Sequence, residues 1–366
     1  MRCHAAALVG AAPFLWAAPQ GALQYAPSSG ATDEQTWTVQ HTLSLSEVVL
    51  DVGDEEEGGA PEMTMEASRT RSLTIAQVHD EARGGAPIVL TRAFRDVEES
   101  IEATFVIPND DLDETLEASI EAPLDGARVR FRREDGATEW SRAVVDEDGD
   151  EVADDEGDEL LTGLTVDAHL AGLLAGLEEP AAGASWEAEP TSVVPLVLPG
   201  GHLGAEIEAI PADDRPYQAC AAGVDPLLGM DLHHLLLGES DGALEGEVLC
   251  AIQEWPAEGS GRATISIEVR VEATRDVLER MEPWLDSIDE PVSIRAKSAT
   301  ATLRMEGSGE IVWDLDASLP TAVSLELSLA YTLQREADLV TPGGQELDLH
   351  TVVELDGELT SAMSTD

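Results

Sequence analysis

The chain has 366 residues, and its 74 acidic and 20 basic side chains give a formal net charge of −54 at pH 7. A surface this negative repels polyanions, so nucleic acids and anionic membrane surfaces are excluded as docking partners. No catalytic signature stands out, and the residues alone do not name an activity.

The first 22 residues are typical of a secretory signal peptide. Met1-Arg2 gives a positive start, residues 5–18 are mostly apolar and uncharged, and small residues follow. The apolar run is shorter than the roughly 20 residues that a membrane-spanning helix needs. We therefore expect an exported protein, periplasmic or extracellular, without a transmembrane segment and with a flexible mature start at residues 23–34.

Alternation of apolar and polar residues predicts long strands. From Val323 to Leu333 every second residue is large and apolar or aromatic, and the same period runs through 265–271, 299–305 and 347–355. A period of two places one set of side chains on a buried face and the other in water, as in an antiparallel sheet with one solvated side. The predicted fold class is therefore mainly β (α+β).

Turn residues predict where strands are connected. Asp125-Gly126 suits a two-residue hairpin turn that would place Ile120 opposite Phe131. Farther along, Gly307-Ser308-Gly309 is predicted to separate two strands, because glycine is depleted in strand interiors.

We predict two tandem antiparallel curved-sheet modules, each with one short helix packed on its apolar face. The first spans 35–200, with a helix at 167–177 and a linker rich in Pro and Gly at 178–201. The second spans 202–366, with a helix at 274–288. Both helical segments carry Leu or Met at helical spacing, which is typical of a packing face.

The linker contains two short motifs that follow Leu173-Leu174. They are Gly183-Ala184-Ser185-Trp186-Glu187 and Leu198-Pro199-Gly200-Gly201-His202-Leu203. This arrangement resembles a pattern in uncharacterised exported bacterial β-proteins, in which a G-x-x-W-E element precedes an L-x-P-G-G turn between two sheet regions. The resemblance covers about thirty residues. It implies an exported β-protein in two parts, and no activity or site residues.

Two cysteines, Cys220 and Cys250, remain after removal of the signal peptide. In an oxidising compartment an isolated pair favours a disulfide. Such a bridge would stabilise the fold by about 3–4 kcal/mol in the chain-entropy model. The alternative is two buried free thiols.

The densest acidic run contains Asp146, Asp148, Asp150 and Asp154. Calcium binds six to eight oxygen ligands, and alternating carboxylates can supply several of them, so a weak calcium site is one hypothesis. The spacing does not match an EF-hand, and the alternative is a solvated acidic loop. No other cofactor is predicted.

Gly238-Glu239-Ser240-Asp241-Gly242 has the letters of a nucleophile elbow. That motif requires a strand before it and a helix after it, whereas the residues that follow indicate a turn into a strand. The leading hypothesis is a non-catalytic envelope or secreted protein that binds an apolar ligand or a protein partner. The alternatives are a secreted hydrolase that uses carboxylates or Ser240, and an acidic surface protein that collects calcium. The oligomeric state is not specified.

Overall fold

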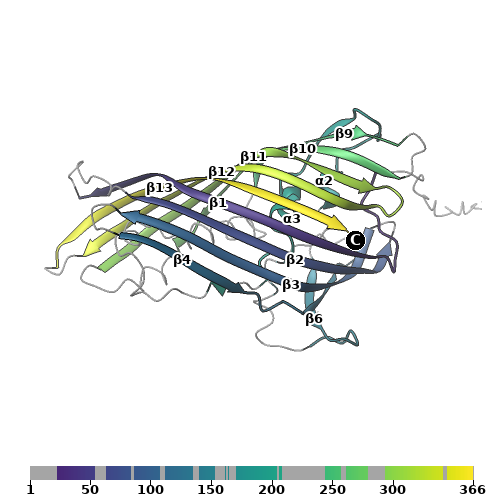
Figure 1. The fold of residues 1–366 in the computed structure, drawn as a ribbon, viewed down its shortest axis with the longest axis horizontal. Helices are drawn as coiled ribbons and strands as arrows, with labels where there is room; N and C mark the ends of the chain where they lie inside the picture. Colours follow the sequence, from purple (N-terminus) through teal and green to yellow (C-terminus); the bar gives the residue numbers. More distant parts are fainter. Residues whose placement is uncertain are drawn as a thin grey trace, which may run out of the picture.

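Long antiparallel strands dominate the protein and join in one 13-stranded sheet (Figure 1). The computed structural model describes residues 23–53, 63–83, 86–107, 112–134, 140–152, 161, 164, 170–203, 206–207, 244–256, 261–278, 293–340 and 344–365. The fold class predicted from the period of two, mainly β, is confirmed.

Among the described elements, six strands have 20 or more residues and each helix is a single turn. The strands are β1 (Thr32–Val52), β2 (Thr64–Arg83), β3 (Ala86–Ile107), β4 (Leu112–Glu121), β5 (Arg128–Arg132), β6 (Ser141–Val145), β7 (Ser185–Ala188), β8 (Glu206–Ile207), β9 (Glu245–Glu254), β10 (Arg262–Asp276), β11 (Ser293–Asp314), β12 (Leu319–Val340) and β13 (Glu346–Thr365). The short helices are α2 (Leu170–Leu173), the 3₁₀ turn η3 (Pro190–Val193) and α3 (Val194–Val197).

Strands β1 and β13, the first and the last of the described strands, pair in the middle of the sheet. The strand order is β6-β5-β3-β2-β1-β13-β12-β11-β10-β9-β7, with β4 added to β3 and β8 to β4. Strands β1 and β13 pair from Gln35 opposite Thr365 to Val52 opposite Leu349. The prediction of two separate sheets is therefore not confirmed, because this pairing joins both halves of the chain in one sheet.

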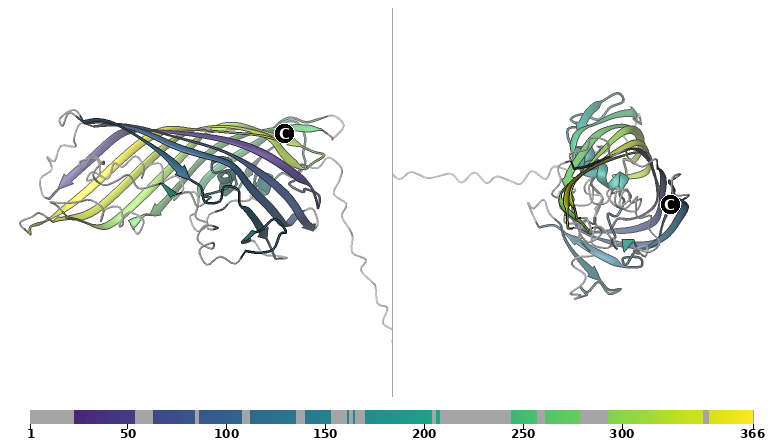
Figure 2. Two further views of the ribbon diagram at one scale, coloured as in Figure 1. Left: turned by 60° about the horizontal axis from the view of Figure 1, so that its bottom comes forward. Right: turned by 90° about the vertical axis from the view of Figure 1, so that its left-hand side faces the viewer.

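The sheet is strongly curved, and its two faces differ (Figure 2). Strand β1 buries Gln35, Trp37, Val39, His41 and Leu43 and exposes the residues between them. We call the buried side the inner face and the solvated side the outer face. In Figure 2 the strands curve around the segment that carries α2 and α3. Since α3 also contacts β13, this segment covers part of the inner face.

The two predicted helices agree with the described elements only in part. Within the described part of the predicted 167–177, helix α2 covers Leu170–Leu173, and Leu170 and Leu173 are buried as the stripe indicates. Residues 174–176 form a turn, and residues 167–169 lie outside the described part. The predicted start of the second helix, Thr274–Asp276, belongs to β10. These three residues continue β10 as strand. The Thr274 hydroxyl lies 3.0 Å from the Thr302 hydroxyl on the neighbouring strand β11. Residues 279–292 lie outside the described part.

The predicted hairpin at Asp125-Gly126 is wrong in its pairing. The chain does turn there, with Gly126 at a φ of 77°. However, β4 and β5 each pair with β3 instead of with one another. The 22-residue β3 is long enough to take β4 along 100–107 and β5 along 89–93.

Gly307-Ser308-Gly309 does not end a strand, because β11 runs through it. Both glycines are in phase with the inner face, and a Cβ on either would collide with a backbone carbonyl oxygen of β12. Glycine is required because neighbouring backbones approach closely where the sheet bends. Within the described residues, no helix has the length and apolar character needed to cross a membrane.

Candidate functional site

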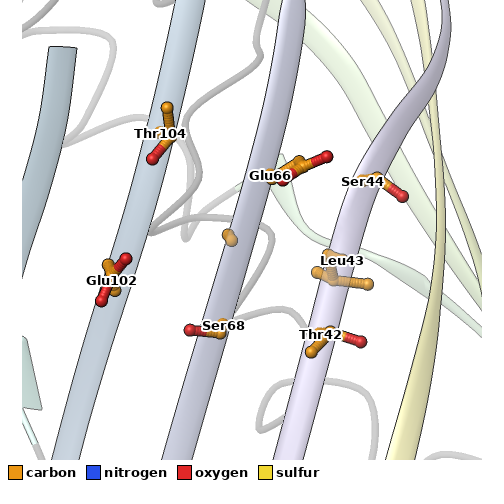
Figure 3. A pocket seen from close by; sticks show the side chains of 8 residues that line it. Thr42, Leu43, Ser44, Glu66, Ser68, Glu102 and Thr104 are labelled. Carbon is orange, nitrogen blue, oxygen red and sulfur yellow. The ribbon is translucent and has the colours of Figure 1, made fainter.

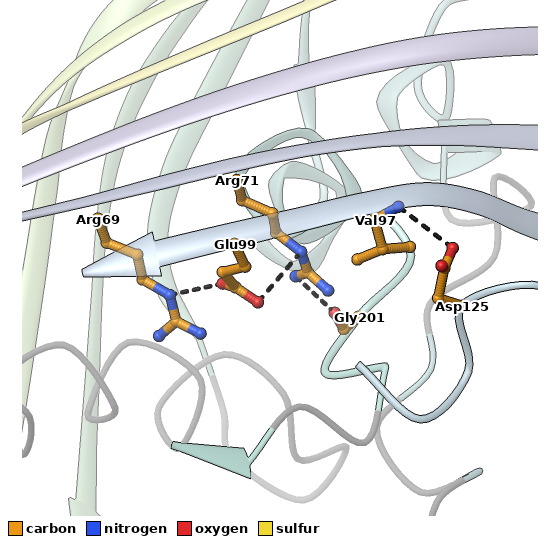
Figure 4. Close-up of polar contacts among 6 residues, drawn as sticks. All are labelled: Arg69, Arg71, Val97, Glu99, Asp125 and Gly201. Atoms are coloured by element: carbon orange, nitrogen blue, oxygen red, sulfur yellow. Dashed lines mark hydrogen bonds and ion pairs between the residues drawn. The ribbon is translucent and has the colours of Figure 1, made fainter. Parts of the chain in front are cut away.

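A group of charged and polar side chains lies buried on the inner face, among apolar neighbours. It consists of His41 on β1, Arg69 and Arg71 on β2, Glu99 on β3 and Tyr331 on β12. Each of these residues is at most 5% exposed. We call this group the inner cluster; Figure 4 shows its two arginines and Glu99.

The carboxylate of Glu99 pairs with two guanidinium groups in this cluster. Arg69 Nε donates a hydrogen bond of 2.6 Å to Glu99 Oε1. Arg71 Nε lies 3.8 Å from Glu99 Oε2, which is an ion-pair distance without a hydrogen bond. The register explains the arrangement, because β2 and β3 pair Arg71 directly opposite Glu99 while Arg69 reaches it diagonally.

His41 and Tyr331 meet across β13, which separates their strands. Their ring centroids are 5.9 Å apart. The register places His41 opposite Leu359 and Tyr331 opposite Leu355, so Gly357 lies midway between them on the same face. Because Gly357 has no side chain, the two rings can lean together over it.

Burial and neighbouring charges shift the pKa values of these groups. Burial raises the pKa of Glu99, but the positive charges of Arg71, Arg69 and His202 outweigh this, so the pKa is lowered overall. Burial lowers the pKa of Arg71; Glu99 opposes this effect and the charge of Arg69 adds to it. Burial also raises the pKa of Tyr331 far above its usual range, so its hydroxyl stays protonated.

The second linker motif contacts the cluster directly. Arg71 Nη1 donates a hydrogen bond of 2.8 Å to the Gly201 carbonyl (Figure 4). Gly200 and Gly201 have φ values of 75° and 82°, and Leu203, which is fully buried, has a φ of 57°. A left-handed conformation is strained for leucine and persists only where the surrounding packing enforces it. The turn is therefore held firmly against the inner face.

The first linker motif anchors the same segment from its other end. The indole of Trp186 donates a hydrogen bond of 2.6 Å from Nε1 to the Leu173 carbonyl. Between the two motifs, the Ser361 hydroxyl of β13 donates to the carbonyl of Leu196 in α3. Both motifs that the sequence singled out are thus used to fix the linker on the inner side.

A second polar network lies on the same face, nearer the start of β1. Arg92 Nε donates to Gln77 Oε1 at 2.6 Å, and Gln77 Nε2 lies 3.0 Å from His79 Nε2. His79 Nε2 is also 3.3 Å from a carboxylate oxygen of Asp33, which accepts a hydrogen bond from Gln35 on its other oxygen. These groups form a chain of polar contacts, although His79 Nδ1 and Asp33 Oδ1 are buried without a hydrogen-bond partner.

The outer face carries a shallow depression of about 250 Å³ over β1, β2 and β3 (Figure 3). Its polar lining consists of hydroxyls and two carboxylates, with no basic side chain and no cysteine. The lining residues are Thr42, Leu43, Ser44, Glu66, Ala67, Ser68, Glu102 and Thr104. The hydrolase alternative, which uses carboxylates or Ser240, stays a prediction.

Three of the four predicted calcium ligands, Asp146, Asp148 and Asp150, lie in a solvated turn after β6. The carboxylate of Asp146 accepts a hydrogen bond of 2.9 Å from the backbone N–H of Asp150, and Asp148 is exposed between them. Asp154 lies outside the described residues. In the part of the chain that is described, no group of three or more His, Cys, Asp or Glu side chains could hold a metal ion. The calcium site stays a prediction.

Cys250 lies on the inner face of β9 as a buried free thiol, and burial raises its pKa to about 12. Its predicted partner Cys220 and the predicted nucleophile Ser240 both fall outside the described residues, and so does the predicted signal peptide. The mature start at 23–34 is packed in part, because Leu23 and Tyr25 are buried and β1 already begins at Thr32.

The inner cluster was not predicted from the sequence, although a signal for it is present there. In β2, Arg69 and Arg71 occupy the same alternation phase as the apolar Met65, Leu73 and Ile75. Burying a charged side chain costs free energy unless it is paired and hydrogen-bonded, so a charged residue in the buried phase of a strand indicates a partner or a function.

Comparisons with known proteins do not assign this chain to a family. No protein-family model matches it, and no curated protein matches its sequence. Among solved structures, it is similar to the one described as "High pH structure of Pseudomonas putida OprB", with 9% identity over 91% of this chain and 94% of that chain. The TM-score of 0.15 is too low for this likeness to support an argument.

Proposed function

We propose that this chain is an exported, non-catalytic binding protein that holds an amphipathic ligand against the inner face of its sheet. The apolar part of the ligand would lie along the leucine-rich inner face, and its polar end would reach the inner cluster. The leader-like amino terminus supports export, and the one-sided sheet supports binding on the inner side.

The observation that carries this proposal is the inner cluster itself. Glu99 and Arg71 are each about 95% or more buried, and the next residues in the same phase of their strands, Ile101 and Leu73, are apolar. Replacing a buried charged group by apolar residues of similar volume is often neutral or stabilising, so packing alone gives no reason to keep it. Sites that break the local pattern in this way are the expected places for function.

The surroundings of the cluster suit an apolar chain. On the same inner face, Val39 lies opposite Arg71, and Leu43 lies beside Gly357 where the sheet lacks a side chain. Leu355 and Leu359 flank that glycine on β13, and both are buried. A ligand that displaced α3, with the Gly201 turn still bound to Arg71, would lie on apolar side chains that lead to a charged end.

Fluorescence quenching can test the proposal. Trp37 lies on the inner face of β1, two residues from Val39, so a brominated long-chain alcohol or acid bound there would quench its emission. We expect saturable quenching at micromolar concentrations, below the critical micelle concentration of each probe. A Trp37→Phe variant should lose most of this signal.

The control is an indole away from the proposed site. Trp140 lies near Arg133, which stacks over its ring at 5.0 Å, and a Trp140→Phe variant should keep the quenching. If neither probe quenches the wild-type protein in a saturable manner, ligand binding on the inner face is rejected.

A further inference from the structure

We propose that the polar end of this ligand is an oxyanion, a carboxylate or phosphate, and that Arg71 is the residue that binds it. The inference rests on the proposed function, because it specifies the chemistry of a ligand held on the inner face.

Arg71 has donor atoms to spare although it is buried. Its side chain is 4% exposed, and its Nη1 is occupied by the Gly201 carbonyl. Its Nε and Nη2 atoms are buried without a hydrogen-bond acceptor, since Glu99 Oε2 lies 3.8 Å from Nε. A guanidinium left with unused N–H groups in a low-dielectric interior is costly, and an acceptor at this position would remove much of that cost.

The charge balance favours an anion over a neutral acceptor. Glu99 is shared by Arg69, which holds its Oε1 at 2.6 Å, and by Arg71, which makes only the longer ion pair. The depressed pKa of Arg71 reflects this, because burial and the charge of Arg69 both oppose its charged form. A carboxylate or phosphate on Arg71 would supply the missing negative charge.

The geometry of the side chain suits such a ligand. Nε and Nη2 lie on one edge of the planar guanidinium group, and together they form the fork that binds two oxygens of a carboxylate or phosphate. The opposite side is fixed, because Nη1 is tied to the linker turn. The oxyanion would therefore lie between Arg71 and the Glu99 carboxylate, which would have to move slightly aside.

The negative outer surface does not contradict this site. It repels polyanions and anionic membranes as surfaces, whereas a single amphiphile has one or two charges. Screening by salt should speed its approach, because the repulsion falls off within about 8 Å at physiological ionic strength. Faster binding at higher salt is thus expected for the anionic probes and not for a neutral one.

The test compares head groups on one hydrocarbon chain. Wild-type protein is titrated with hexadecanoate, hexadecyl phosphate, hexadecanol and hexadecyltrimethylammonium, each displacing the brominated probe that reports on Trp37. We expect the two anions to bind about 10- to 100-fold more tightly than the alcohol, as one charge-assisted hydrogen-bond pair implies, and the cation to bind least. This arm requires no substitution, so it stands even if a variant does not fold.

The second arm is Arg71→Met, with Arg71→Lys beside it. The methionine variant should bind hexadecanol as the wild type does and lose the preference for the anions, whereas lysine should keep part of it. Arg304→Met, on the outer face, is the matched control and should change no affinity. Circular dichroism and melting curves establish that each variant is folded.

The outcomes separate the two proposals. If no probe of any charge binds, the proposed function fails and this inference fails with it. If all probes bind but the anions have no advantage, or Arg71→Met keeps that advantage, the oxyanion inference is overturned while the proposed function stands. If inorganic phosphate binds as tightly as hexadecyl phosphate, the site takes a free anion and the amphipathic ligand is rejected.

Discussion

The inner and outer faces of this sheet are built from the same strands, yet they treat charge in opposite ways. On the outer face, Arg304 of β11 and Glu272 of β10 form two hydrogen bonds, of 2.6 and 3.1 Å, with side chains that are 66% and 43% exposed. On the inner face, Arg69 and Glu99 form a bond of the same length with almost no exposure. Solvent therefore decides what each pair contributes, because water screens the first and is absent from the second.

The separation of the two faces also explains how a chain with a charge of −54 can fold. Most of the acidic residues described on the strands occupy the solvated phase of the alternation, as Glu326 does between Leu325 and Leu327. In that position their repulsion is weakened by water and salt. Glu99 is an exception, in the buried phase, and it is held between two arginines.

The largest expected effect comes from removing the buried carboxylate. Glu99→Gln leaves Arg69 and Arg71 buried without this anion, and we expect the free energy of unfolding to fall by about 3–5 kcal/mol in urea titrations. The matched outer-face variant is Glu306→Gln, whose partner Arg270 is more than half exposed. Similar losses in the two variants would contradict the distinction between the faces.

The pH dependence of the wild type provides an independent check on Glu99. Its pKa is lowered in the folded state, so the carboxylate stabilises the fold at pH values above its usual pKa of 4.5, and this contribution disappears as the pH falls through the lowered value. We expect the wild type to lose stability below about pH 5 more steeply than Glu99→Gln does. Parallel curves for the two proteins would show that Glu99 is not ionised in the fold.

The next largest expected effect is the loss of stability on replacing Gly357, the glycine between the rings of His41 and Tyr331. A Cβ at Gly357 would collide with the Thr42 carbonyl of β1, so Gly357→Val should destabilise the protein by about 3 kcal/mol. Ala362→Val, on the exposed phase of the same strand, is the control and should stay within about 0.5 kcal/mol of the wild type. A small loss for Gly357→Val would mean that the sheet can flatten there.

A smaller effect is expected where the linker is anchored to the inner side. Trp186→Phe keeps most of the buried ring but leaves the Leu173 carbonyl without its donor, which should cost about 1–3 kcal/mol. Trp255→Phe is the control, because Trp255 is only partly buried and its indole has no hydrogen bond within the described residues. If both variants unfold at the same urea concentration, the linker is not held by this bond.

The local pattern of the sequence predicts the strands well and their partners poorly. A period of two depends on each residue and its nearest neighbours, so it assigned the inner and outer phases of β10, β12 and β13 correctly. Pairing depends on distant segments, and nothing near Gln35 indicates that it lies opposite Thr365. This is why two sheets were predicted where one forms, and why β4 and β5 were paired with each other instead of with β3.

The same limit applies to the glycines and to the candidate site. Glycine in a strand pattern has two meanings, a break or a close approach of backbones, and only the neighbouring strand distinguishes them. For the inner cluster, the phase of Arg69 and Arg71 was visible in the sequence, but their shared partner Glu99 lies on another strand. A site assembled across β1, β2, β3 and β12 requires the sheet order before its members can be grouped.

The smallest expected effect is on the outer face, where the Arg304–Glu272 pair has good geometry but is solvated. A double-mutant cycle with Arg304→Gln and Glu272→Gln should give a coupling energy of about 0.2–1 kcal/mol in low salt, and less in high salt. The two single variants should differ, because Arg304 offsets some of the charge of −54 while Glu272 adds to it. Arg304→Gln should therefore lower the melting temperature, whereas Glu272→Gln should leave it almost unchanged. A coupling energy as large as that expected for the Glu99 cluster would show that solvent exposure does not set the strength of charge pairs in this sheet.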